Sequence, residues 1–401
     1  MAVEPEPAPG ANGLLIGATA PVIISENGLR LDVKFVEGML RHCALWPGPV
    51  RVLLRKGAAA IPFGAEYDPA TLPFRLEILE PDQQPGPAML DGIAAVFATA
   101  DDPSLLRLGP LARQAGATLV WSLEYTLETR LRIAAMDPGR NLPRRLWSML
   151  WNLQAERARR RALRQADGVQ FNGYPAWDAY HRMTPEPLLY LDNRMHAAMM
   201  AGPDEMRSRA ERLRSGAPLR LIHSGRLEPM KGAQDLIPVM RALQAHGVHA
   251  TLDIYGSGAL EGAIRAALPQ FDGRVRLHGP VDFETELVPA SRSGADVFLS
   301  CHRQSDPSCT YLEAMGCGLA IAGYDNRMWR RLAAESGGGL VSPMGRTAEL
   351  AARIAQWDRE RDGDRAGLIA AQNAALAFAR KHDFEREFTA RMRHLRQLAG
   401  S

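Results

Sequence analysis

Two short segments in the second half of the chain carry residue types that bind phosphate groups. In the first, Arg226 and Lys231 lie between Gly225 and Gly232. Two cations in one loop can reach neighbouring phosphates, and flanking glycines let the backbone approach a ligand closely. The segment is not a Walker loop, because the Gly-Lys-Ser/Thr triplet is missing. Taken alone, it fits a solvated basic loop better than a binding site.

The second segment, residues 306–318, predicts the start of a helix. Asp306 or Ser308 can cap that helix, which leaves the first backbone amides available to an anion. Those amides belong to Cys309, Thr310 and Tyr311. Glu313 falls one turn into the helix, where its carboxylate can accept hydrogen bonds from a ribose diol. The alternative is a capped core helix with Glu313 at its solvent edge. Together, the two segments suit a ligand that carries a diphosphate and sugar hydroxyls, so they favour a nucleotide-sugar site.

The residues around these segments predict a parallel sheet. Short apolar runs alternate with helical patterns through the second half of the chain. The predicted strands are residues 219–223, 250–255, 274–277, 295–300 and 319–322. This alternation is typical of βαβ units, in which ligands bind beyond the carboxyl ends of the strands. Gly225, Gly256, Cys301 and Gly323 all follow such ends, so the candidate motifs lie on the ligand-binding edge of the sheet.

The first half repeats the α/β pattern, with strands predicted at residues 21–25, 50–54, 93–98, 117–121 and 168–171. We expect two similar α/β domains, at residues 16–200 and 201–370. A disordered tail at 1–15 would precede them, and helices at 371–401 would follow and could cross back to the N-terminal domain. Gly28 lies in a turn between the first strand and a helix that could face a cleft, and Glu124, at a similar edge position, is a possible acceptor-side acid. Ordinary loops explain both equally well.

A glycine-rich turn at residues 256–258 resembles part of a dinucleotide-binding fingerprint. The third glycine arrives late, at Gly262, and a tight strand-to-helix turn explains the segment at least as well. An NAD-dependent oxidoreductase is therefore an alternative, but it lacks an acidic partner for the adenine ribose. It also leaves the basic loop and the acidic helix start unexplained.

Bulk composition excludes several classes of protein. A chain of 401 residues, 46% hydrophobic and 23% charged, is typical of a soluble globular protein with two domains. A formal net charge of +3 is too small to indicate a nucleic-acid partner. The acidic start lacks the basic residues of a signal peptide, and no apolar run approaches the roughly 20 residues that span a bilayer. Four cysteines without a disulfide or zinc pattern fit a reducing cytoplasm.

One helical segment, residues 146–164, combines aromatic and basic side chains. Leucines and the tryptophans Trp147 and Trp151 stand close to seven arginines between positions 144 and 164. This combination suits an anionic membrane surface. A helix that packs its apolar stripe on the sheet and leaves its arginines in water explains the segment slightly better. Peripheral contact with the inner face of the membrane stays an open hypothesis.

Taken together, these residues resemble the family 4 glycosyltransferases (glycosyl transferases group 1), which have the GT-B fold of two Rossmann-like domains facing across a cleft. The resemblance is strong over residues 219–343 and mainly architectural before them. It rests on Ser224-Gly225-Arg226 with Lys231-Gly232, on Ile254-Tyr255-Gly256-Ser257-Gly258, on Tyr311-Leu312-Glu313-Ala314-Met315-Gly316-Cys317-Gly318, and on Glu335 with the run at 338–341.

The resemblance implies a hexosyltransferase-like enzyme of cell-surface polysaccharide assembly. It would move a sugar from a nucleotide-diphosphate donor to a saccharide or lipid-linked acceptor. The donor would lie on the C-terminal domain, with Arg226 and Lys231 on its diphosphate and Glu313 on its ribose. Transfer would retain the anomeric configuration without a metal or other cofactor, because cations and helix amides would stabilise the leaving diphosphate. We also predict ligand contacts from Gly28, Gly225, Gly256, Ser308, Thr310 and Tyr311.

One departure from the family concerns its first glutamate. The matching position is Ser305, which cannot supply a carboxylate. We predict that the adjacent Asp306 does so, turned towards the donor-sugar hydroxyls because the diphosphate would repel it. Asp306 and Glu313 are therefore the candidate catalytic residues. The departure also leaves open a non-catalytic homologue that binds nucleotide sugars without turnover.

Overall fold

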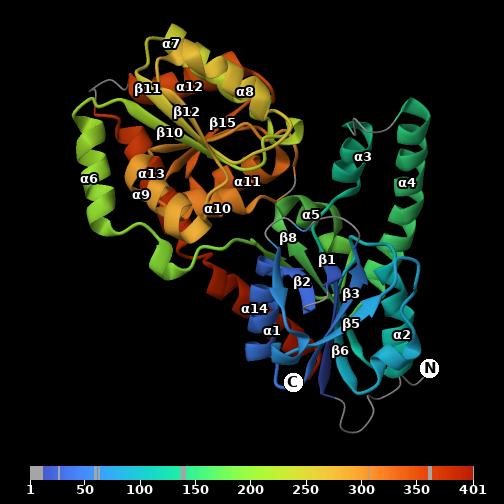
Figure 1. Cartoon of the computed structure of the whole chain (residues 1–401). Helices are drawn as coiled ribbons and strands as arrows, with labels where there is room; N and C mark the ends of the chain where they lie inside the picture. Colours follow the sequence, from blue (N-terminus) through green and yellow to red (C-terminus); the bar gives the residue numbers. More distant parts are fainter. Residues whose placement is uncertain are drawn as a thin grey trace. The chain divides into compact units, whose positions relative to one another are not determined.

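The computed structural model describes residues 12–25, 28–57, 61, 64–136, 141–305, 307–359 and 364–400. The chain forms two compact units, which we call unit 1 (Met1–Tyr190 with Phe388–Ser401) and unit 2 (Leu191–Glu387). The division falls after Tyr190 and after Glu387, whereas the sequence predicts boundaries at residues 200 and 370. Each unit is an α/β structure around its own sheet (Figure 1).

Unit 1 contains a nine-stranded sheet among the described residues, with strand order β4-β2-β1-β6-β7-β8-β9 and with β3 and β5 joined through β1. Its strands are β1 Gly13–Ser25, β2 Gly28–Asp32, β3 Val50–Lys56, β4 Gly64–Tyr67, β5 Arg75–Leu79, β6 Ile93–Thr99, β7 Thr118–Leu123, β8 Gly168–Asn172 and β9 Pro187–Tyr190. Its helices are α1 Val33–Leu45, α2 Leu108–Ala115, α3 Leu127–Met136, α4 Leu142–Arg164 and α5 Gly173–Tyr180. All pairings are parallel except those of β2, which runs antiparallel to β1 and β4.

The first strand corrects two predictions. It begins at Gly13, inside the predicted tail, and Leu14 and Leu15 are fully buried in the sheet. The tail prediction is therefore wrong for residues 13–15, because these apolar side chains are core residues; residues 1–11 lie outside the described part. Gly28 opens strand β2 and not a turn leading directly to a helix.

Unit 2 contains a six-stranded sheet with order β12-β11-β10-β13-β14-β15, parallel throughout its described pairings. The strands are β10 Leu219–Ser224, β11 Ala250–Tyr255, β12 Val275–Gly279, β13 Val297–Ser300, β14 Ala320–Tyr324 and β15 Gly339–Ser342. The helices are α6 Pro203–Arg214, α7 Leu236–Ala245, α8 Glu261–Ala267, α9 Val288–Gly294, α10 Cys309–Gly316, α11 Arg327–Ser336, α12 Thr347–Asp358 and α13 Ala366–Ala379. Within unit 2, α7 and α12 lie together on one side of the sheet, and α10 and α13 on the other (Figure 1).

The core of unit 2 explains why the sequence predicted these strands well. β13 and β14 are buried at every position, and Leu221, Leu252 and Val297 are at most 1% exposed. Strands covered on both faces read as continuous apolar runs, the pattern seen in the sequence.

The predicted pair of C-terminal helices is also present, as α13 and as α14 Phe384–Leu398. From Phe388 onwards the chain belongs to unit 1, where the Gln170 side-chain amide donates to the Arg391 carbonyl at 2.8 Å.

Candidate functional site

The loop after β10 carries both predicted cations. Arg226 is exposed two residues beyond the strand, and Lys231 ends the short 3₁₀ helix Pro229–Lys231. The Gly225 amide donates to the Tyr255 carbonyl at 3.0 Å, which fixes the loop to the end of β11. A Cβ atom on Gly225, whose φ is 148°, would meet no described atom within 4 Å. The backbone at this position therefore borders open space, as a ligand-facing loop requires.

Gly256 and Gly258 bring the loop after β11 against the loop after β10. A Cβ atom on Gly256 would lie 2.0 Å from the Gly225 carbonyl oxygen, and one on Gly258 would lie 2.7 Å from that of Leu227. The Leu227 amide donates to the Ser257 carbonyl at 2.9 Å. These glycines are needed for loop packing, which accounts for the turn without a dinucleotide; a ligand contact by Gly256 stays a prediction.

Gly232 joins the Lys231 loop to the loop that follows β13. It has a φ of 70°, and a Cβ atom there would lie 1.7 Å from the Cys301 carbonyl oxygen. The Arg303 amide donates to the Met230 carbonyl at 3.1 Å across the same contact. Because the loop after β13 leads directly into α10, the basic loop and the acidic helix start are neighbours in the folded unit.

Two buried histidines lie next to Lys231. His223 is a buried residue near the end of β10, and His302 lies in the loop after β13. The centroids of the two imidazole rings are 6.4 Å apart. Burial is the main cause that lowers the pKa of His223 to about 4, and the Lys231 charge contributes to the lowering. Burial also holds the pKa of His302 well below its usual value, again with a contribution from Lys231. Both imidazoles are therefore neutral near pH 7, and Lys231 supplies the positive charge in this part of the site.

The first turn of α10 is organised by Ser308 and Tyr311. Ser308 is the N-cap residue, and its hydroxyl shares a hydrogen bond with that of Thr310 at 2.8 Å. The Tyr311 amide donates to the Ser308 carbonyl at 3.2 Å. The sequence predicted that this amide is available to an anion, but the hydrogen bond to Ser308 occupies it.

The Tyr311 side chain is turned into the core and is 1% exposed. Its hydroxyl accepts from the Asn326 side-chain amide at 3.0 Å, and its ring stacks on Trp329 with centroids 5.4 Å apart. Tyr311 therefore fixes the position of α10. Ligand contacts by the Cys309 and Thr310 amides stay predictions.

Glu313 lies on α10 with 8% of its surface exposed, and its carboxylate accepts from Arg194 Nε at 3.3 Å. The Arg194 guanidinium in turn covers the Phe283 ring, 3.8 Å from the centroid. Arg194 therefore orients the predicted ribose-binding acid. The sequence did not single out Arg194, because it lies near the end of the first predicted domain in a segment without any motif.

Ser305, the residue at the family's first glutamate position, serves the neighbouring helix. It is 6% exposed, and its hydroxyl accepts from the Arg327 amide at 3.3 Å, in the first turn of α11. Asp306 lies outside the described residues, so its predicted role stays a prediction.

Gly28 belongs to unit 1, apart from the other predicted site residues. Its φ is 143°, and a Cβ atom there would lie 2.4 Å from the Tyr67 carbonyl oxygen. Close packing of β2 on β4 thus explains the glycine, and a ligand contact stays a prediction.

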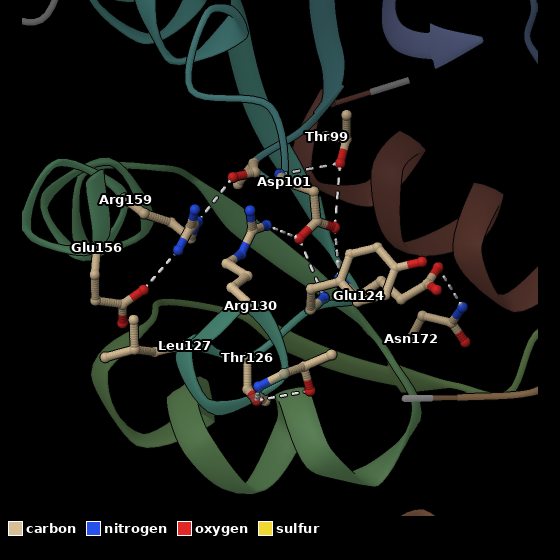
Figure 2. Close-up of polar contacts among 12 residues, drawn as sticks. Thr99, Asp101, Glu124, Thr126, Leu127, Arg130, Glu156, Arg159 and Asn172 are labelled. Carbon is tan, nitrogen blue, oxygen red and sulfur yellow. Dashed lines mark hydrogen bonds and ion pairs between the residues drawn. The ribbon is translucent and has the colours of Figure 1, made fainter. Parts of the chain in front are cut away.

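Unit 1 has its own polar cluster at the carboxyl ends of β6, β7 and β8 (Figure 2). Asp101 accepts from the amides of Glu124 and Tyr125 at 2.8 and 3.1 Å and pairs with Arg130. The Glu124 carboxylate accepts from the Asn172 side-chain amide at 3.2 Å. Asp101 therefore fixes the backbone at Glu124, the candidate acceptor-side acid. Glu124 lies at the carboxyl edge of the sheet, where ligands bind in α/β folds.

Residues 218–358 match the family model described as glycosyl transferases group 1. The match covers the sheet of unit 2 and both candidate segments, and it confirms the predicted resemblance at the level of group 1. No curated protein matches the chain significantly.

Three solved structures illustrate the similarity, which extends over the whole chain. HepE of Anabaena in complex with UDP is 15% identical, with a TM-score of 0.60 over 97% of this chain and 98% of that one. Sucrose-phosphate synthase of Thermosynechococcus elongatus is 18% identical, with a TM-score of 0.64 over 97% and 100%. A glycosyltransferase of Rickettsia africae is 7% identical, with a TM-score of 0.61 over 96% and 98%. These likenesses confirm the predicted GT-B type of fold.

Two features are absent from the described residues, a membrane-spanning helix and a cluster of metal ligands. None of their helices combines the length and the apolar character that crossing a bilayer demands. No three histidine, cysteine, aspartate or glutamate side chains among them gather in a way that could hold a metal ion.

Proposed function

We propose that this protein is a glycosyltransferase that moves a sugar from a nucleotide-diphosphate donor to a saccharide or lipid-linked acceptor. The observation that carries the proposal is the contact at Gly232, which holds the Lys231 loop against the loop leading into α10. That contact lies within the segment that matches glycosyl transferases group 1. The UDP complex of a protein with a similar fold supports a nucleotide-sugar donor.

Each part of the unit 2 site has a role in this proposal. Arg226 and Lys231 bind the donor diphosphate, and the amides of Cys309 and Thr310 donate to it from the start of α10. Glu313, oriented by Arg194, accepts hydrogen bonds from the ribose. As the donor bond breaks, the cations and amides stabilise the charge that develops on the leaving diphosphate.

The finer features are also proposals. The enzyme belongs to the family 4, hexosyltransferase-like group, retains the anomeric configuration and needs no bound metal. Asp306 contacts donor-sugar hydroxyls in place of the missing glutamate. Glu124, held at the edge of unit 1 by Asp101 and Asn172, binds an acceptor hydroxyl. We place the enzyme in the cytoplasm, because all four cysteines are free thiols, as a reducing compartment keeps them. Its role in cell-surface polysaccharide assembly is proposed from the resemblance to family 4.

A donor panel tests the proposal. Binding and hydrolysis are measured for UDP-, GDP- and ADP-sugars, with NAD as a control and with EDTA present or absent. We expect one nucleotide sugar to bind and turn over equally well with EDTA. Binding without turnover with every acceptor tried would indicate the non-catalytic homologue. Binding of NAD alone would contradict the proposal.

Replacing Arg194 by alanine should weaken donor binding about tenfold, because Glu313 would lose the hydrogen bond that orients it. Arg292→Ala is the matched control, since Arg292 also forms a partly buried pair in unit 2, with Glu205 at 2.7 Å. Titration calorimetry with the donor found in the panel compares the two variants with the parent protein. Equal losses in both, tracking a fall in melting temperature, would mean that Arg194 acts only on stability.

A further inference from the structure

Helix α4 buries mainly polar side chains and exposes most of its large apolar side chains. Its buried side chains include Ser148, Asn152, Glu156 and Arg159. Leu146, Trp147 and Leu150 are 61%, 66% and 62% exposed. The prediction that this helix packs its apolar stripe on the sheet is therefore wrong. Apart from the buried Leu163, polar residues face the protein and apolar residues face outwards, the reverse of the usual arrangement.

Buried ion pairs explain why the polar side faces inwards. Arg159, fully buried, donates to the Ala100 carbonyl at 3.0 Å and to Glu156 at 2.6 Å (Figure 2). Arg130, on α3, pairs with Asp101 in the same cluster. These contacts tie α3 and α4, which lie side by side in unit 1, to the ends of β6 and β7 (Figure 1). The helix is thus held firmly with its apolar side in solvent.

The exposed apolar residues form a single stripe that turns basic along the helix. Helix geometry places residues spaced by three and four positions on one side, so the leucines at 142, 146, 150 and 153 align. Arg157, Arg161 and Arg164 continue the same line, and all three are exposed. With Arg160 and Gln165 they line an open hollow. We call residues 142, 146, 150, 153, 157, 161 and 164 the α4 stripe.

Charge along the α4 stripe points to an anionic partner. Helix α4 contains seven arginines and one acid, Glu156, which is already paired with Arg159 and Arg160. No carboxylate in the described part of the chain pairs with Arg157, Arg161 or Arg164. Exposed leucines beside arginines that no described carboxylate neutralises form an apolar and cationic surface, and exposed apolar patches of this kind mark interaction sites.

We propose that the α4 stripe binds the surface of a membrane rich in anionic lipid. The leucines enter the boundary between headgroups and acyl chains, and the arginines bind lipid phosphates. Trp147 and Trp151, 66% and 42% exposed beside the stripe, have the amphipathic rings that favour this interface. The inference is independent of the donor site and of the proposed activity.

A second copy of the chain fits the α4 stripe less well. In a parallel helix pair, the arginines of the two copies would face each other and repel. In an antiparallel pair, they would face leucines and lose water without gaining a partner. Lipid phosphates meet the arginines while the acyl region receives the leucines, so a membrane satisfies both halves of the stripe.

Vesicle co-sedimentation tests the proposal with the full chain at an ionic strength of about 0.1 M. We expect binding to vesicles that contain phosphatidylglycerol, and little to pure phosphatidylcholine. Charge reversal in Arg157→Glu/Arg161→Glu should weaken binding by at least about 30-fold, from about 1 kcal/mol for each arginine. The matched control is Arg207→Glu/Arg346→Glu, at side chains that are 68% and 72% exposed outside α4.

The apolar half has its own variant pair. Leu146→Ser/Leu150→Ser should reduce binding by at least about tenfold. Ile24→Ser/Leu40→Ser, at side chains 54% and 44% exposed elsewhere in unit 1, should leave it unchanged. Circular dichroism checks that each variant is folded.

Several outcomes would overturn the proposal. These are failure of the parent protein to bind anionic vesicles, equal binding to pure phosphatidylcholine, or equal loss in the test and control pairs. Light scattering without lipid tests a further outcome that would overturn the proposal. If the parent protein is a dimer and the Leu146→Ser/Leu150→Ser variant is a monomer, the α4 stripe is a self-association surface.

Discussion

Alanine in place of Lys231 should lower kcat/KM for the donor by about 10²- to 10³-fold, the usual loss when one preorganised group that stabilises transition-state charge is removed. The effect should be large because the neighbouring histidines cannot substitute for the lysine. Burial lowers the pKa of both His223 and His302, and it is the main cause in each case, so both stay neutral near pH 7 even in the variant. Steady-state kinetics with the donor found in the panel measures the loss.

The control for that experiment is Lys381→Ala. Lys381 is an exposed lysine of unit 2 between α13 and α14, remote in sequence from both candidate segments. We expect it to keep the parental rate. A Lys231→Ala variant that retains parental kcat and KM would remove the diphosphate role of Lys231, and with it the central support for the proposed function.

Replacement of Gly232 by alanine should cost about 3–5 kcal/mol of the free energy of unfolding. A residue with a side chain is strained at a φ of 70°, which accounts for about 1–2 kcal/mol. The rest comes from the new Cβ atom, which would lie 1.7 Å from the Cys301 carbonyl oxygen and would push two backbones apart. Because the displaced loop carries Lys231, donor affinity should fall as well. Denaturant unfolding and donor titration measure the two effects.

Gly247 provides a close match for the backbone strain alone. Its φ is 73°, and a Cβ atom there would meet no described atom within 4 Å. Gly247→Ala should therefore cost only about 1–2 kcal/mol and leave donor affinity unchanged. If the two variants were equally stable and bound donor equally well, the contact between the Lys231 loop and the α10 loop would not matter for the site.

The sequence predicted the sheet of unit 2 because strands such as β13 and β14 are buried on both sides and appear as plain apolar runs. It also placed Gly225, Arg226 and Lys231 correctly at a strand end. It did not predict the occupied Tyr311 amide, since that depends on a local turn. Arg194 escaped notice because its partner, Glu313, is 119 positions away in the chain.

Helix α4 shows where pattern reasoning fails. The rule that apolar stripes face inwards assumes that the polar side of the helix has no strong hydrogen-bonding partner inside the protein. In α4, the side chains of Arg159 and Glu156 are buried and form hydrogen bonds within the protein, and the leucines of the α4 stripe are therefore exposed to solvent. The periodicity of the sequence is the same in both cases. It does not show whether the polar side of a helix forms hydrogen bonds with the end of a sheet or faces water.

The backbone seams at Gly232, Gly256 and Gly258 constrain how relatives of this protein can change their specificity. The loops after β11, β10 and β13, three neighbouring strands of the sheet, are packed so tightly that an inserted or deleted residue in the loop after β10 would displace the other two. Under the proposed function, a change of donor would therefore come from exchanging single side chains on an unchanged backbone. Libraries that vary residue identity at Arg226 or Ser308 should yield folded proteins, whereas libraries that vary the length of these loops should yield mostly insoluble chains.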